Sequence, residues 1–229
     1  MMQGMEFGAM ARQLKWQAVA LAGLLSACAY HLASPIADFE SRLIEPPVPE
    51  GRYCNLTAEG ELDPDCAVLV WHADTRMFEM RDEGGEEPPT QFSLVGLSEG
   101  LVAAEVISDE MPYPYQVYLF AHTEDAFVFL PIADDEGALM LAERYPGVEL
   151  SEQEGIYMTG EAEAVREFLN ACARLALATA RVEGDEPDIA VYAPDKTETV
   201  TPAQLKSRER LLALADQLAD EAPELERAE

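Results

Sequence analysis

The residues best suited to chemistry in this chain are a serine, a histidine and an aspartate in its central part. Gly96 to Gly100 reads G-L-S-E-G, which matches the G-x-S-x-G pattern of a nucleophilic serine on a strained turn between a strand and a helix. In that hypothesis Ser98 attacks the substrate, His122 acts as the base and Asp109 orients the histidine. These three residues are the catalytic candidates that the sequence offers.

A second interpretation makes the same motif an ordinary turn between two strands. The segment that follows, L-V-A-A-E-V-I-S, is short and suits a strand better than the helix that a catalytic turn needs. His122 is the only histidine downstream of Ser98 and falls in an expected hairpin turn. Asp109 is only 13 positions before it, a much shorter spacing than serine hydrolases of this type normally have. We therefore assign no catalytic residue and keep a small serine hydrolase as the alternative.

The charge of the chain argues against several kinds of partner. Asp and Glu number 44 against 15 Lys and Arg, which gives a formal charge of −29. Such a surface repels phosphate backbones, so we expect no nucleic-acid binding. The acidic runs lack the spaced ligands of a calcium loop, and neither the cysteines nor the histidines are spaced for zinc. A glycine-rich phosphate loop is also missing, and we expect no metal site and no cofactor.

The N-terminus has the three parts of an export signal. Arg12 and Lys15 precede an apolar run from Trp16 to Ala27, an order typical of secretory signal peptides. The run is shorter than the ~20 apolar residues of a bilayer-spanning helix. Residues 1–27 are therefore predicted to be a signal peptide. Translation from Met10 would give a more compact start, and the choice between Met1 and Met10 stays open.

This signal ends in Leu25-Ser26-Ala27-Cys28. The four residues resemble the lipobox of bacterial lipoprotein precursors, in which a branched apolar residue and two small ones precede an invariant cysteine. The resemblance covers only the N-terminal segment. It implies cleavage before Cys28 and lipidation of its thiol; the alternative is an unprocessed helix with Cys28 buried.

The residue after the cysteine bears on the destination. By the sorting rule of that family, Ala29 in place of Asp implies delivery to the outer membrane, with the domain facing the periplasm. Three acyl chains on Cys28 would give durable anchoring, since one chain binds only marginally. The expected partner is thus the membrane itself; an envelope protein as a further partner, and the oligomeric state, stay open.

The remaining cysteines differ in setting. Cys54 and Cys66 flank a turn-rich stretch, and in an oxidising periplasm we expect them to form a disulfide; two reduced thiols are the alternative. Closing so short a loop is worth about 3 kcal/mol in the chain-entropy model. Cys172 lies on an apolar stripe at helical spacing and is expected in the core.

The rest of the chain alternates between strand and helix patterns. The strands read as hairpins. The two strands of the clearest hairpin, 113–122 and 126–133, are apolar on both faces, so each side of the sheet needs a cover. Thr201 to Gln204 forms a capping box that opens the last helix. The expected strands are 66–73, 76–81, 90–95, 100–108, 113–122, 126–133 and 188–194. The expected helices are 34–44, 136–145, 159–181 and one from 202 onward.

We therefore expect an α+β fold: a mainly antiparallel β-sheet built from hairpins and covered by two or three helices. Residues 28–50 should form a lipidated tether with a short helix, 51–192 the α+β domain, and 193–229 a linker, a C-terminal helix and an acidic tail. The function expected is that of a non-enzymatic binding or structural module, with a carrier of a small apolar ligand as a further alternative. One set of aromatic residues is interpreted as sheet core: Tyr113, Tyr115, Tyr118, Phe120, Phe127 and Phe129.

Overall fold

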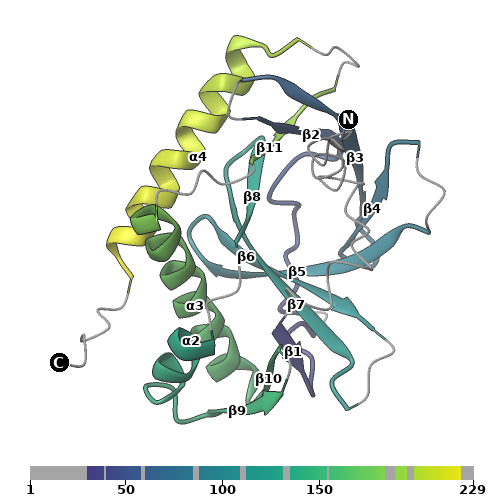
Figure 1. Ribbon diagram of the computed structural model, residues 1–229. Helices are drawn as coiled ribbons and strands as arrows, with labels where there is room; N and C mark the ends of the chain where they lie inside the picture. The colour runs from purple at the N-terminus through teal and green to yellow at the C-terminus, as the bar shows by residue number, and fades with distance from the viewer. Residues whose placement is uncertain are drawn as a thin grey trace, which may run out of the picture.

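The computed structural model describes residues 30–38, 40–57, 60–84, 88–108, 112–130, 135–153, 155–183, 189–194 and 199–222. Its main feature is a closed β-barrel of eight antiparallel strands, with helices packed against one side (Figure 1). Strands β2 to β8 pair with their neighbours in chain order, and β11 closes the ring between β8 and β2. The predicted antiparallel α+β class is therefore confirmed, and the sheet is a barrel rather than an open layer.

The eleven strands in the described part of the chain belong to one continuous sheet. Three of them, β1, β10 and β9, extend it beyond the ring from one edge of β7. Their bounds are β1 Tyr30–Leu32, β2 Gly51–Leu56, β3 Leu62–His72, β4 Met77–Asp82, β5 Thr90–Ser98, β6 Leu101–Ile107, β7 Tyr115–His122, β8 Ala126–Leu130, β9 Val148–Gln153, β10 Gly155–Gly160 and β11 Ile189–Tyr192.

Residues of the barrel wall alternate between two apolar cores because successive side chains of a strand point to opposite faces. On β6, Leu101 and Ala103 belong to the outer core, whereas Val102 and Ala104 belong to the inner one. The expectation that both faces of these strands are covered is confirmed. The outer face of β5 to β8 and of β11 is covered by helices, and the inner face by the opposite wall of the barrel.

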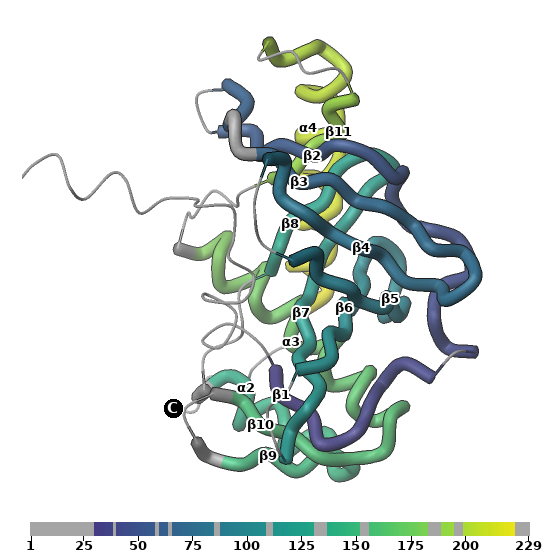
Figure 2. The backbone as a smooth tube through the Cα atoms, turned by 90° about the vertical axis from the view of Figure 1, so that its right-hand side faces the viewer, coloured from purple at the N-terminus to yellow at the C-terminus, as the bar shows by residue number. Residues whose placement is uncertain are grey.

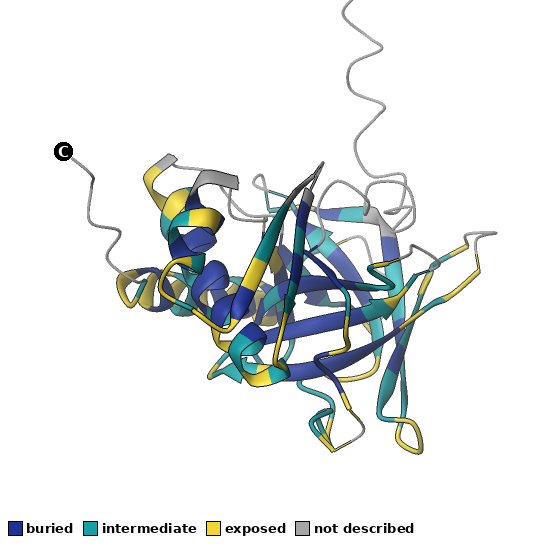
Figure 3. Ribbon diagram, turned by 90° about the horizontal axis from the view of Figure 1, so that it is seen from below, coloured by how far each residue is buried: buried dark blue, intermediate teal, exposed yellow. Residues whose placement is uncertain are grey.

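Within the described chain, three helices cover the outer face: α2 (Asp135–Ala142), α3 (Ala162–Glu183) and α4 (Pro202–Asp220). Figure 3 shows buried and exposed positions on the same helices, as expected of elements with one face on the barrel. The predicted cap is present, because Thr201 Oγ1 accepts a hydrogen bond from Gln204 N and Gln204 Oε1 accepts one from Thr201 N. Helix α4 contributes Leu211 and Leu218 to the outer core, so it belongs to the body of the domain.

The segment between β1 and β2 differs from the expected tether. Among the described residues of 34–44, turns and bends take the place of the predicted short helix. Ile36 is 2% exposed, and Arg42 forms an isolated bridge with Val95 of β5. The reason is that hydrogen bonds to the barrel replace those a helix would make within itself: Ile36 N donates to Glu105 and Leu43 N donates to the carbonyl of Leu94. Figure 2 shows this part of the chain running along the barrel up to β2.

Candidate ligand-binding site

An apolar pocket occupies the interior of the barrel. Together with the open space at its mouth, its empty volume is about 570 Å³, so it is a pocket that is partly open to solvent. About 50 Å³ of this space admits the centre of a water molecule, so the enclosed part suits a slender chain better than a bulky ring. Its lining residues come from six strands and from the segment before β2: Pro47, Val48, Leu69, Phe78, Met80, Phe92, Leu94, Val102, Ala104, Val106, Tyr118, Phe120, His122, Phe127 and Phe129.

Phenylalanine side chains of β7 and β8 form one wall of this pocket. The ring centroids of Phe120 and Phe129 lie 4.1 Å apart, and those of Phe120 and Phe127 lie 5.9 Å apart in an edge-on arrangement. Phe129 is 37% exposed, so this wall reaches the surface there. Of the aromatic residues interpreted as core from the sequence, Tyr118, Phe120 and Phe127 belong to the inner core, whereas Phe129 is exposed. All four line the pocket.

Among the described lining residues, His122 is the one whose ordinary pKa lies near neutral pH. Burial lowers the pKa of its imidazole, because the charged form loses its hydration. The imidazole is therefore neutral near pH 7 and adds no fixed charge to the pocket. A ligand inside the pocket meets hydrocarbon and aromatic surface, which favours an uncharged, apolar molecule.

One end of the barrel is filled by residues 42–48, which we call the plug. Leu43 and Val48 pack with the inner core, and Pro47 and Val48 line the pocket. The plug is attached by the Leu43–Leu94 hydrogen bond of 3.0 Å and by Arg42, whose guanidinium donates to the carbonyl of Thr75 at 3.1 Å. Ile44, in contrast, is 71% exposed on the outside of the plug.

The plug is itself anchored through a buried carboxylate on the outer face of β6. Glu105 is 4% exposed and accepts a hydrogen bond of 2.6 Å from the backbone of Ile36. Burial raises its pKa, while hydrogen bonds from the backbone of Ile36 and Ala37 and the charge of Arg42 act in the opposite direction. Glu105 thus holds the chain that leads from β1 to the plug.

Ser98 lies at the end of β5 and faces the helices. Its hydroxyl donates to Asn170 Oδ1 at 2.8 Å and accepts from Arg174 at 3.3 Å. Arg174 also pairs with Glu221 beyond the end of α4, so the hydroxyl belongs to a network that ties the β5–β6 turn to α3 and α4. His122 lines the pocket on the other face of the wall.

The catalytic candidates are therefore not brought together within the described part of the chain. Ser98 bonds to α3, whereas the nearest partner of the His122 ring is the carbonyl of Thr123, at 3.4 Å. Asp109 lies outside the described residues. The arrangement of Ser98 and His122 does not place this imidazole within hydrogen-bonding distance of the hydroxyl, as a general base would need to be.

The second glycine of the G-x-S-x-G motif, Gly100, is explained by packing. Gly100 has a φ of +73°, and a Cβ there would lie 2.5 Å from Cδ2 of Leu214 in α4. Only glycine gives both this backbone conformation and the close approach of the helix. The turn interpretation of Gly96 to Gly100 thus agrees with the strand–turn–strand path of β5 and β6.

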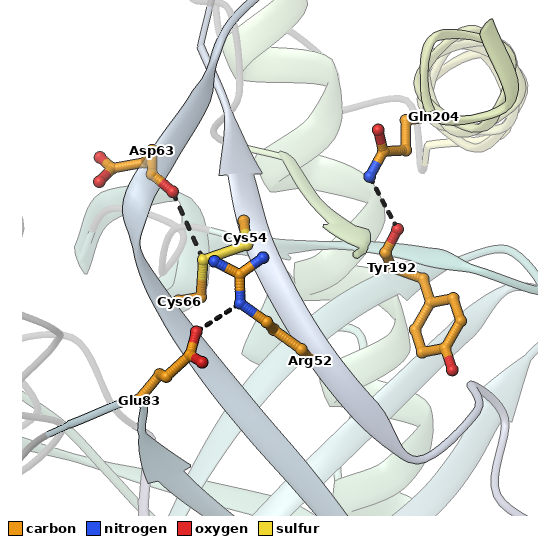
Figure 4. The surroundings of a disulfide bond; sticks show 7 residues. All are labelled: Arg52, Cys54, Asp63, Cys66, Glu83, Tyr192 and Gln204. Atoms are coloured by element: carbon orange, nitrogen blue, oxygen red, sulfur yellow. Dashed lines mark hydrogen bonds and ion pairs between the residues drawn. A yellow bond between two sulfur atoms is a disulfide. The ribbon is translucent and has the colours of Figure 1, made fainter. Parts of the chain in front are cut away.

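The predicted disulfide between Cys54 and Cys66 is confirmed, and it joins two residues paired across β2 and β3. Figure 4 shows it beside the ion pair of Arg52 and Glu83, which links β2 to the end of β4. Cys172 is buried in the outer core, as expected, and burial raises its pKa to about 12. Cys28 lies outside the described residues.

No protein-family model, curated protein or solved structure matches this chain. Within the described ranges, no group of three or more His, Cys, Asp or Glu side chains is placed to hold a metal ion. Among the helices that the structure describes, none is both long and apolar enough to cross a membrane. The pocket is therefore the feature on which a function can be argued.

Sequence reasoning missed the pocket because it did not foresee the closure of the sheet. The alternation of large apolar residues at Tyr118, Phe120, Phe127 and Phe129 was visible, but an open sheet covered by helices would bury them equally well. The signal that could have suggested a barrel is the run of successive hairpins from 66 to 130.

Proposed function

We propose that this protein is an outer-membrane lipoprotein, anchored through Cys28, whose periplasmic barrel binds one small apolar ligand. The observation that carries the binding function is the apolar pocket inside the barrel. An eight-stranded barrel has an interior just wide enough to be filled by side chains or to hold one small ligand. Here the lining leaves space, and the lining residues described carry no fixed charge at neutral pH.

The pocket is tested with diphenylhexatriene, an uncharged, rod-shaped dye whose fluorescence rises in apolar surroundings. We expect saturable binding by the exported Cys28→Ser protein. Ala104→Phe, which adds a ring to the pocket lining, should weaken that binding by about tenfold or more. Ala203→Phe, on the exposed first turn of α4, is the matched control. Absence of saturable binding, or equal binding by both alanine variants, would contradict the proposal.

The anchor is tested separately by the mass and location of the protein in its own envelope. Wild-type protein should carry the mass of the acyl chains on Cys28 and stay with the outer-membrane fraction. Cys28→Ser should lack this mass and leave that fraction. An unchanged mass and an unchanged location would refute lipidation, while leaving the pocket function intact.

A further inference from the structure

The start of β1 and the end of β8 lie next to each other on one edge of β7. Tyr30 pairs with Val117, and Leu130 pairs with Leu119 on the same strand. Two residues along a strand correspond to about 6.6 Å. The chain therefore enters the sheet at Tyr30 close to the place where β8 leaves the barrel.

This place is also the exposed end of the pocket. Phe129 directly precedes Leu130, lines the pocket, and is 37% exposed. The plug with Ile44 fills a different end, where it contacts β5 at Leu94 and Val95. Figure 2 shows the chain leaving β1 and running up the right-hand side of the barrel in that view to reach β2.

Covalent geometry then limits the distance between the predicted lipid and the pocket. Cys28 is two residues from Tyr30, so their Cα atoms are at most about 7 Å apart. Tyr30 is 1% exposed and is held between β7 and β10. The predicted anchor therefore directly adjoins the folded body, in contrast to the tether expected from the sequence.

We propose that the anchor holds the Phe129 end of the pocket against the bilayer, and that the pocket takes up one acyl chain of a zwitterionic phospholipid from that bilayer. This inference rests on the proposed anchor and on the proposed pocket function. A single acyl chain matches the slender apolar interior, while the headgroup stays outside because the lining offers it no charged partner. The acidic excess of the chain, −29, disfavours an anionic headgroup.

The orientation of the barrel on the bilayer can be tested whether or not Cys28 is lipidated in cells. In the oxidised chain from Cys28 onward, Cys54 and Cys66 are bonded and Cys172 is buried, so a maleimide-headgroup lipid couples at Cys28. The coupled protein is placed on phosphatidylcholine vesicles whose acyl chains carry bromine, which quenches tryptophan on contact. Trp71 is replaced by Phe, and a reporter tryptophan is introduced either as Phe129→Trp or as Ile44→Trp.

We expect the Phe129→Trp fluorescence to fall by more than half on brominated vesicles relative to unbrominated ones. Ile44→Trp, an exposed reporter on the plug, should keep its intensity. Equal quenching of the two reporters, or stronger quenching at Ile44, would overturn the orientation. Dye binding by the uncoupled Cys28→Ser protein would in that case still support the pocket function. Failure of the proposed orientation can therefore be told apart from failure of ligand binding.

Uptake of the acyl chain is read by native mass spectrometry of protein released from phosphatidylcholine vesicles. The Cys28→Ser protein, incubated with these vesicles and separated from them, should carry the mass of one phospholipid. Ala104→Phe should lose this adduct and Ala203→Phe should keep it. An adduct that is absent, or one retained equally by Ala104→Phe, would overturn acyl-chain uptake.

Discussion

The inner and outer faces of the barrel wall belong to the same strands, but on β7 and β8 the inner face carries aromatic rings whereas the buried residues of the outer face are aliphatic. On the outer face of β6, β7 and β8, three alanines are fully buried where the helices approach: Ala103, Ala121 and Ala126. The inner face of β7 and β8 carries Tyr118, Phe120, Phe127 and Phe129 instead.

These three buried alanines let the helices approach this part of the outer face closely. The large rings of the inner face still leave space, because strand number and tilt fix the width of a barrel. Most of the buried apolar residues belong to the outer core, so we expect this core to supply most of the stability, while the inner face has room for a ligand.

The largest effect should come from truncating an outer-core ring. Phe168 of α3 is fully buried and lies edge-on to Tyr145, with ring centroids 5.8 Å apart. Phe168→Ala should lower the free energy of unfolding by about 3–5 kcal/mol in urea titrations followed by circular dichroism. Phe129→Ala, on the inner face and partly exposed, should cost less than about 1 kcal/mol. Similar losses for both variants would contradict the distinction between the faces.

Two adjacent alanines of β6 give the closest comparison of the faces. Ala103 is completely buried under the helices, whereas Ala104 lines the pocket. Ala103→Leu should cost about 1–3 kcal/mol because a well-packed core cannot accept the added carbons. Ala104→Leu should change the free energy of unfolding by less than about 0.5 kcal/mol, since its added carbons enter empty space. The same urea titration measures the loss of unfolding free energy for both variants. A larger loss for Ala104→Leu than for Ala103→Leu would show that the pocket side is not the less tightly packed one.

Glu105 tests how the outer face holds the plug. Glu105→Ala removes the acceptor of the Ile36 amide, and leaving that group unsatisfied should cost about 1–3 kcal/mol. Glu105→Gln keeps an acceptor oxygen without the buried charge and should cost much less. If the glutamine variant loses as much stability as the alanine variant, the carboxylate charge itself is essential.

The raised pKa of Glu105 also predicts the direction in which this residue changes the stability with pH. The folded state binds this proton more tightly than the unfolded state, so the associated stability is present at low pH and is lost as the pH rises through the folded pKa. Glu105→Gln should remove this part of the pH dependence when unfolding is measured across the acidic range. A pH profile identical to that of the wild type would contradict the assignment.

A modest effect is expected at Ser98. Ser98→Ala removes hydrogen bonds to α3 and should cost about 0.5–1.5 kcal/mol. A fluorophosphonate probe should not label the folded wild-type protein, because the hydroxyl bonds to Asn170 and Arg174 rather than to a base. Labelling that disappears in Ser98→Ala would instead support the hydrolase alternative.

Local patterns in the sequence were sufficient for most strands and helices. The hairpins from 66 to 130, the α3 stripe and the cap at Thr201 depend on interactions between residues close in the chain, and the structure has them. The disulfide was also predictable, because Cys54 and Cys66 flank a turn-rich stretch that brings neighbouring strands together.

Contacts between distant residues were not predictable in the same way. The pairing of Tyr30 with Val117 and with Ile156 of β10 converts the supposed tether into part of the sheet. The helix expected at 34–44 had suitable spacing, but hydrogen bonds to Glu105 and Leu94 outweigh that weak local preference. The pocket depends on closure by β11, and no local pattern shows which strands a given segment will pair with.

Strand β11 has a further consequence for the order in which the protein folds. It pairs on one side with β2, near the start of the domain, and on the other with β8. A chain delivered N-terminus first can form the β2–β8 meander from local hairpins, but the ring stays open until Ile189–Tyr192 arrives. Until then β2 and β8 present unpaired edges, which are prone to join other strands. Closing the ring late, through contacts far apart in sequence, should make it the slow step of folding.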